Sequence, residues 1–197
     1  MPATVEFLFD LASPAAYLAW TRMPGLAART GARVVFRPIL LGGLFKALGN
    51  RSPVEIPAKG RWFRADLERF ADRYGVPLAW PPGFPVNSLE LMRGAVAAER
   101  AGVLAAYGDA VYGGMFGRGL DMADPGVVAG VLREAGLDAD ALMAEARTAP
   151  VKEALRAATA EAEARGAFGV PTFFVGGAMF FGQDRLDWVE AALRRPD

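Results

Sequence analysis

The chain has 197 residues, of which 53% are hydrophobic, and its 22 lysine and arginine residues balance 22 aspartate and glutamate residues. This length and apolar content predict one domain, or one domain with a sizeable insertion. The balanced charge favours neither nucleic acid nor an anionic membrane surface as a partner. Glu6 interrupts the first apolar run, and no run approaches the roughly 18 apolar residues of a membrane span, so we expect a cytoplasmic protein without a signal peptide or transmembrane helix.

The sequence contains neither cysteine nor histidine. This composition excludes a zinc site of the usual kind, a serine–histidine–aspartate triad, a cysteine nucleophile and a protein disulfide. We therefore expect no metal site, and any thiol or imidazole chemistry must come from a bound molecule.

The first 40 residues predict a β-α-β unit. Residues 5–9 read as a short strand, and residues 14–30 repeat apolar side chains at helical spacing. The pair Pro24-Gly25 should kink or divide this helix, and Gly31 should end it. Residues 33–38 predict a second strand that runs parallel to the first.

The corner between the first strand and the helix holds Ser13 and Pro14. Ser13 can cap the helix, and Pro14 would occupy the first helical position, where its missing N–H costs nothing. Free backbone N–H groups and the positive end of a helix dipole suit an anion here. Taken alone, the pair favours an ordinary helix cap over an anion site.

Between Leu41 and about Gly166, helical patterns separated by glycine and proline replace the strand signal. We expect helices over residues 58–74, after Asn87 and Glu90 at the spacing of a capping box, over 104–116, after Asp124-Pro125, after Asp138, and from Pro150 to Gly166. Strands then return over 172–175 and 178–181 around a glycine-pair turn, and a last helix starts over 182–188.

This order, with Gly169-Val170-Pro171-Thr172-Phe173 opening the third strand, resembles an α/β thioredoxin-like fold of the DsbA and kappa-class glutathione transferase type. The resemblance implies a thioredoxin-like domain of residues 1–40 and 167–197 and an inserted α-helical domain of residues 41–166. It also implies a cis-proline at Pro171, which would leave the backbone of Val170 free to pair with an extended peptide-like ligand. A plain strand start is the alternative interpretation. Redox members carry two cysteines where this chain has Ser13-Pro14-Ala15-Ala16, so dithiol exchange is impossible.

Motifs along nearly the whole chain resemble the family of 2-hydroxychromene-2-carboxylate isomerases and the related kappa-class transferases. They are Phe9-Asp10 with Ser13-Pro14 and Tyr17, Arg37-Pro38 with Leu41-Gly42-Gly43, Lys46 and Gly49-Asn50, the Lys59 segment, Phe84-Pro85-Val86-Asn87-Ser88, Gly169 to Phe173, and Phe181-Gly182-Gln183-Asp184-Arg185-Leu186. The resemblance implies a glutathione-dependent isomerase of bacterial naphthalene-type degradation. It would interconvert 2-hydroxychromene-2-carboxylate and trans-o-hydroxybenzylidenepyruvate by reversible thiolate addition, bond rotation and elimination, as a homodimer.

The same resemblance implies the site residues. Ser13 is the catalytic residue beside the glutathione sulfur, and the glutathione-binding residues are Ser13, Asn50, Lys59, Val170, Pro171, Gly182, Gln183 and Asp184. Lys46 and Asn87 stand where an acidic aromatic substrate would be held. Simpler interpretations stay open for Asp184 (a helix N-cap), Lys59 and Lys46 (solvated charges), Asn50 (a loop turn) and Asn87 (a helix cap).

Two other functions remain open at this point. A kappa-type glutathione transferase would use the same glutathione site but release a thioether product, and residues 84–88 favour the isomerase over it. A non-catalytic thioredoxin-like binding module that has lost its cysteines would not bind glutathione.

Overall fold

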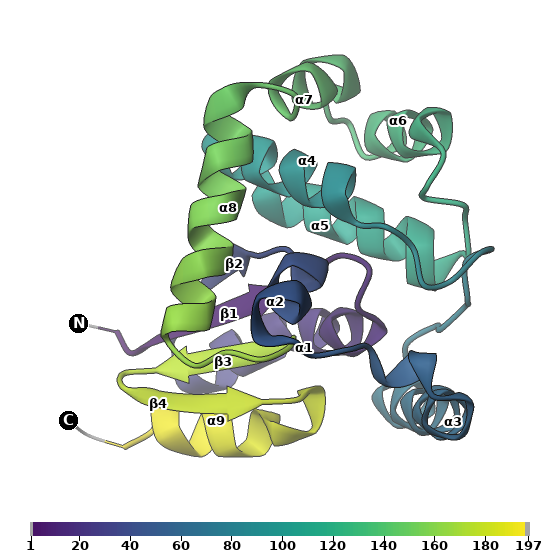
Figure 1. Ribbon diagram of the computed structural model, residues 1–197. Helices are drawn as coiled ribbons and strands as arrows, with labels where there is room; N and C mark the ends of the chain where they lie inside the picture. The colour runs from purple at the N-terminus through teal and green to yellow at the C-terminus, as the bar shows by residue number, and fades with distance from the viewer. Residues whose placement is uncertain (1, 196–197) are drawn as a thin grey trace.

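The computed structural model describes residues 2–195 and contains a four-stranded sheet with helices on both faces (Figure 1). The elements around the sheet are β1 Thr4–Phe9, α1 Pro14–Thr30, β2 Arg33–Pro38, β3 Thr172–Val175, β4 Ala178–Phe181 and α9 Leu186–Leu193. The helices between β2 and β3 are α2 Leu41–Leu48, α3 Pro57–Tyr74, α4 Leu89–Arg100, α5 Leu104–Tyr112, α6 Pro125–Glu134, α7 Ala139–Glu145 and α8 Ala149–Ala164. The predicted order of β-α-β, helical insertion and β-β-α is confirmed.

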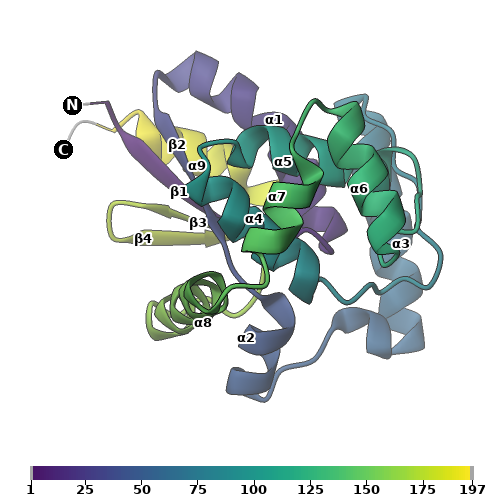
Figure 2. The same ribbon diagram turned by 90° about the horizontal axis from the view of Figure 1, so that it is seen from above.

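The sheet has the strand order β2-β1-β3-β4. β1 runs parallel to β2, as predicted, and antiparallel to β3, which forms a hairpin with β4. Helices α1 and α9 lie on one face and α8 on the other (Figure 2). Because side chains alternate along a strand, Phe7 packs with Trp20 of α1 while the neighbouring Glu6 meets Arg165 just after α8.

Helix α1 is continuous, so of the two outcomes expected at Pro24-Gly25 the division is wrong, while the kink stays a prediction. The helix runs from Pro14 to Thr30 with Pro24 inside it, and Gly31 ends it in the left-handed conformation with φ 68°. A proline in a helix interior costs about 3 kcal/mol. On this helix Trp20, Met23 and Leu26 are all buried, and this apolar burial outweighs one lost hydrogen bond.

The capping box expected at Asn87 and Glu90 does not form. Helix α4 starts at Leu89 with Ser88 as its N-cap, and the Asn87 side chain accepts a 3.0 Å hydrogen bond from the Leu89 N–H. Glu90 pairs with Arg93 on the same helix instead. Asn87 therefore stabilises the turn one residue before the cap.

Two other predicted helices change geometry along their length. Residues 104–116 were expected as one helix, but α5 ends at Tyr112 and the chain continues as a π-helical turn, Gly113–Gly117. The last helix is preceded by a 3₁₀ turn, Gln183–Arg185, and α9 proper begins at Leu186.

The inserted helices share one core with the sheet. The Tyr17 hydroxyl on α1 donates to the Pro77 carbonyl at 2.7 Å, and the Trp20 indole N–H donates to Asp109 of α5 at 2.7 Å. The buried apolar residues of both parts form one continuous cluster. The division into a thioredoxin-like domain of residues 1–40 and 167–197 and an inserted helical domain of residues 41–166 stays a proposal. It describes the order of the elements along the chain. Within residues 2–195, no helix combines the length and apolarity that crossing a membrane requires.

Candidate functional site

A cavity of about 970 Å³ lies between the β1–α1 corner, α2, the start of α3, the loop before α4 and the segment that runs from Phe168 to Asp184. Every predicted site residue except Lys46 lines it: Ser13, Asn50, Lys59, Asn87, Val170, Pro171, Gly182, Gln183 and Asp184. Lys46 is an exposed residue of α2 outside the lining. The structure thus gathers residues that lie up to 171 positions apart, while their binding roles stay predictions.

Ser13 occupies the predicted corner. It is the N-cap of α1, and its Oγ accepts a 3.2 Å hydrogen bond from the Ala16 N–H. Its side chain is buried, with 6% exposure, and it borders the cavity. Because Oγ already serves as an acceptor for the helix, its hydrogen is left to donate to a ligand.

The predicted cis peptide bond at Val170-Pro171 is confirmed, and Phe84-Pro85, for which no cis bond was predicted, is also cis. The Pro171 carbonyl accepts a 3.0 Å hydrogen bond from the Gly182 N–H, which holds the start of β3 against the end of β4. Gly182 has φ 107°, and a Cβ at this position would lie 2.5 Å from Asp184 Oδ1. The close turn therefore requires glycine here.

Gln183 and Asp184 sit in the 3₁₀ turn before α9. The Tyr74 hydroxyl donates to Gln183 Oε1 at 2.7 Å, which leaves the amide N–H groups of Gln183 as donors for a ligand. Asp184 pairs with Arg185 at 2.8 Å. The N-cap of α9 is Arg185, so the interpretation of Asp184 as that N-cap is wrong.

Asn50 and Lys59 reach the cavity in different ways. The Asn50 side-chain amide donates to the Phe168 carbonyl at 3.2 Å, and its oxygen accepts from the Arg51 N–H. Asn50 therefore ties the loop after α2 to the segment before β3, which is more than a simple loop turn. Lys59 is exposed in the first turns of α3 and borders the cavity.

Asp10 is a buried carboxyl at the same corner that sequence reasoning did not place in the site. Its side chain accepts hydrogen bonds from the Ala12 N–H, the Leu41 N–H and the Ser88 hydroxyl. Burial raises the pKa of Asp10, and these three donors act in the opposite direction. An acidic residue at the end of an apolar strand was the available signal.

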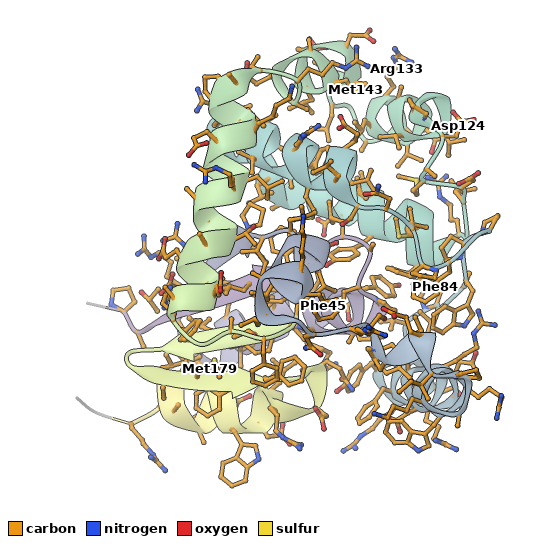
Figure 3. All side chains as sticks on the ribbon, in the orientation of Figure 1. Phe45, Phe84, Asp124, Arg133, Met143 and Met179 are labelled. Atoms are coloured by element: carbon orange, nitrogen blue, oxygen red, sulfur yellow. The ribbon has the colours of Figure 1, made fainter. Side chains whose placement is uncertain are left out.

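Aromatic side chains form much of the rest of the wall; the sequence analysis placed Phe84 and Phe181 in family motifs but named none of the aromatic residues as site residues. Phe45 of α2 and Phe84 of the loop before α4 are labelled in Figure 3. Trp62, Phe168 and Phe181 lie at exposed positions, and Trp62 is 62% exposed. The aromatic residues of the lining are Phe45, Trp62, Phe63, Phe84, Phe168 and Phe181. Together with the cations Arg51 and Lys59, this wall suits a flat apolar ligand that carries a carboxylate.

Comparison with known proteins shows the family and the fold of the chain. The family model described as "DSBA-like thioredoxin domain" matches residues 4–194. A 2-hydroxychromene-2-carboxylate isomerase of Sphingobium xenophagum is 37% identical, with 98% of this chain and 99% of that protein covered. Human glutathione S-transferase kappa 1 is 28% identical over 95% of this chain and 89% of its own length. A solved 2-hydroxychromene-2-carboxylate isomerase structure superposes with a TM-score of 0.88 at 32% identity, covering 96% of this chain and 94% of that one.

Proposed function

Since the chain belongs to the DsbA-like thioredoxin family and is similar over nearly its whole length to 2-hydroxychromene-2-carboxylate isomerases, we propose that it is a glutathione-dependent isomerase of this kind. Its reaction would interconvert 2-hydroxychromene-2-carboxylate and trans-o-hydroxybenzylidenepyruvate. The observation that carries the proposal is the Ser13 hydroxyl, which caps α1 and borders a cavity large enough for a peptide-like cofactor and an aromatic substrate.

The residues of the corner fit a thiol cofactor. Bound glutathione would supply a thiolate that adds reversibly to the substrate, permits rotation about the bond that has lost its double-bond character, and leaves on elimination. Ser13 Oγ accepts from Ala16, so its hydrogen is available to the sulfur, and the start of α1 favours negative charge. A thiol with a pKa of about 8.5 is only a few per cent ionised at pH 7, and lowering this pKa by about two units stabilises the thiolate by roughly 2.7 kcal/mol.

Ser13 itself is assigned as a hydrogen-bond donor and not as a nucleophile. A serine hydroxyl needs a general base to attack; this chain has no histidine, and the hydrogen-bond partner of Ser13 Oγ within residues 2–195 is the Ala16 N–H, which is not a base. The sulfur of bound glutathione would therefore be the nucleophile, with Ser13 as its hydrogen-bond donor.

The rest of the cavity provides partners for the peptide part of glutathione. The backbone of Val170 suits an extended ligand, and the turn of Gly182 and Gln183 presents polar groups to a carboxylate. Asp184 suits the ammonium group, because its exposed pair with Arg185 is worth only about 0–1 kcal/mol and gives way readily. Asn50 and Lys59 suit the remaining carboxylate.

The acidic aromatic substrate is assigned to the aromatic wall, beside Asn87. Lys46, the other predicted contact, would have to reach the substrate from outside the cavity lining, so Asn87 is the better supported of the two. We further propose that the enzyme is cytoplasmic and acts as a homodimer.

A kappa-type glutathione transferase is the second candidate, because human glutathione S-transferase kappa 1 is similar over most of both chains. The two functions share the cofactor site and differ in the fate of the thiol. An isomerase returns it at each turnover, whereas a transferase consumes one thiol for each product.

The test is the turnover of 2-hydroxychromene-2-carboxylate, followed by ultraviolet absorbance with and without glutathione, with the free thiol measured afterwards. Glutathione-dependent conversion with full thiol recovery supports the isomerase. No conversion, together with thiol loss on a general aryl electrophile, supports the transferase. Failure to bind glutathione overturns both and leaves a non-catalytic binding module.

A further inference from the structure

The Asp10 carboxyl lies at the junction of three segments that build the cavity. It is completely buried at the end of β1. Oδ1 accepts from the Ala12 N–H at 2.9 Å in the corner loop. Oδ2 accepts from the Leu41 N–H at the start of α2 and from the Ser88 hydroxyl at the start of α4, each at 2.8 Å.

The backbone of the same residue holds the Ser13 corner. The Asp10 carbonyl accepts from the Ser13 N–H and from the Tyr112 hydroxyl, each at 3.0 Å. The Leu11 N–H donates a hydrogen bond to the sulfur of Met92 at 3.1 Å. The N–H groups of residues 11, 12 and 13 are therefore all engaged inside the protein, which leaves the corner little freedom to rearrange.

We propose that Asp10 is a positioning residue, which couples the Ser13 hydroxyl to the walls formed by the starts of α2 and α4. This inference rests on the proposed role of Ser13. Two of the three donors are backbone N–H groups, which can only donate, so the carboxyl must accept at both oxygens to satisfy them. Asparagine has the same shape but only one acceptor oxygen. In Asp10→Asn, the side-chain NH2 group would therefore face one of these N–H donors in place of an acceptor.

Ser88→Ala tests one of the three hydrogen bonds to the Asp10 carboxyl by itself. Ser88 is the N-cap of α4, but its hydroxyl makes no capping hydrogen bond and is given to Asp10 instead. The variant therefore removes the contact with Asp10 and no helix-cap bond. It also stays informative if Asp10→Asn fails to fold.

The control lies at the other end of α1. Thr30 donates to the Leu26 carbonyl and accepts from the Ala32 N–H, far along the helix from Ser13. Thr30→Ala thus removes hydroxyl contacts of a similar kind without touching the corner.

The experiment measures the amide hydrogen exchange of Ala16, whose N–H binds Ser13 Oγ, together with kcat and the glutathione Kd of the same proteins. We expect faster Ala16 exchange in both variants, with kcat lowered about 100-fold by Asp10→Asn and about 10-fold by Ser88→Ala. The glutathione Kd should change less than about threefold, because its assigned peptide contacts lie elsewhere in the cavity. Thr30→Ala should leave Ala16 exchange and kcat unchanged.

Two results would overturn the proposal: unchanged Ala16 exchange in Ser88→Ala and in any folded Asp10→Asn, or a loss of kcat no larger than in Thr30→Ala. Absence of glutathione-dependent turnover in the unmodified protein would instead refute the proposed function. In that case the hydrogen exchange of the Ala16 amide still tests the positioning role of Asp10, because the exchange is measured without cofactor.

Discussion

The side-chain amide of Asn50 donates a hydrogen bond to the Phe168 carbonyl at 3.2 Å and so joins two walls of the cavity that are 118 residues apart in the chain. The same side chain was expected to bind a carboxylate of glutathione. Both roles use the amide N–H groups, of which Asn50 has two.

We predict that Asn50→Ala weakens glutathione binding about 10-fold, because a polar contact to a charged group and the tie to Phe168 are lost together. Calorimetric titration of glutathione measures the change. Asn50→Asp should weaken binding further, since a second negative charge would face the carboxylate. Equal affinity in Asn50→Asp and the unmodified protein would remove Asn50 from the cofactor site.

Ser13→Ala should lower kcat/KM about 10- to 100-fold near neutral pH while the protein remains folded. The loss follows from the missing hydrogen bond to the thiolate, and the lost helix cap costs about 1 kcal/mol of stability. Because the thiol pKa then rises by about one to two units, the acid limb of the pH–rate profile should move to higher pH by that amount. Ser13→Thr keeps a hydroxyl and serves as the control. An acid limb at the same pH in Ser13→Ala would contradict the assigned role.

Trp62→Ala should raise KM for the aromatic substrate several-fold and leave the glutathione Kd unchanged. Trp62 is 62% exposed and borders the cavity, where it offers an apolar face to a flat ring. Trp188 is 65% exposed on α9 and lies outside the cavity lining, so Trp188→Ala is a matched control. Steady-state kinetics with each substrate varied in turn separates the two constants. Similar KM values in the two variants would exclude Trp62 from the substrate site.

We expect Glu6 to stabilise the folded protein near neutral pH and to lose this contribution in acid. Its hydrogen bond from Arg165, with a further one from Arg37, holds the pKa of Glu6 below its ordinary value of 4.5. Between these two pKa values the unfolded chain binds more protons, so the contribution of Glu6 is present above 4.5 and is lost as the pH falls through the lowered pKa. Urea unfolding of the unmodified protein and Glu6→Gln at several pH values measures it.

The difference between the two unfolding free energies should shrink toward acid pH. Asp10 acts with the opposite sign, since burial raises its pKa and the folded state then binds more protons. This second effect is common to both proteins and cancels in the difference. A difference that stays constant down to about pH 3 would contradict the role of the Glu6 pair.

The local elements of this protein could be read from the sequence because short-range chemistry decides them. Residues 33–38, 172–175 and 178–181 alternate or cluster β-branched and aromatic side chains, and the structure has strands at these positions. Ser13-Pro14 and Gly31 bound α1 for reasons that lie within a few residues of chain. Together with the motifs that resemble the family, these elements were sufficient to predict the fold and nine of the residues that line the cavity.

Tertiary packing decided the features that depend on partners far along the chain. Pro24 stays inside α1 because that helix buries a whole apolar face. The sequence around Pro24 does not show how much apolar surface will be buried, so it could not predict that this burial outweighs one missing hydrogen bond. Lys46 and Lys59 carry the same charge on neighbouring helices, yet only Lys59 borders the cavity, since the packing of each helix sets the direction of its side chains. Asp10 became part of the site only when folding brought Leu41 and Ser88 to its carboxyl, 31 and 78 residues away. The sequence by itself determined the helices, the strands and the Ser13 corner through local chemistry, whereas the cavity walls follow from long-range contacts that exist only in the folded chain.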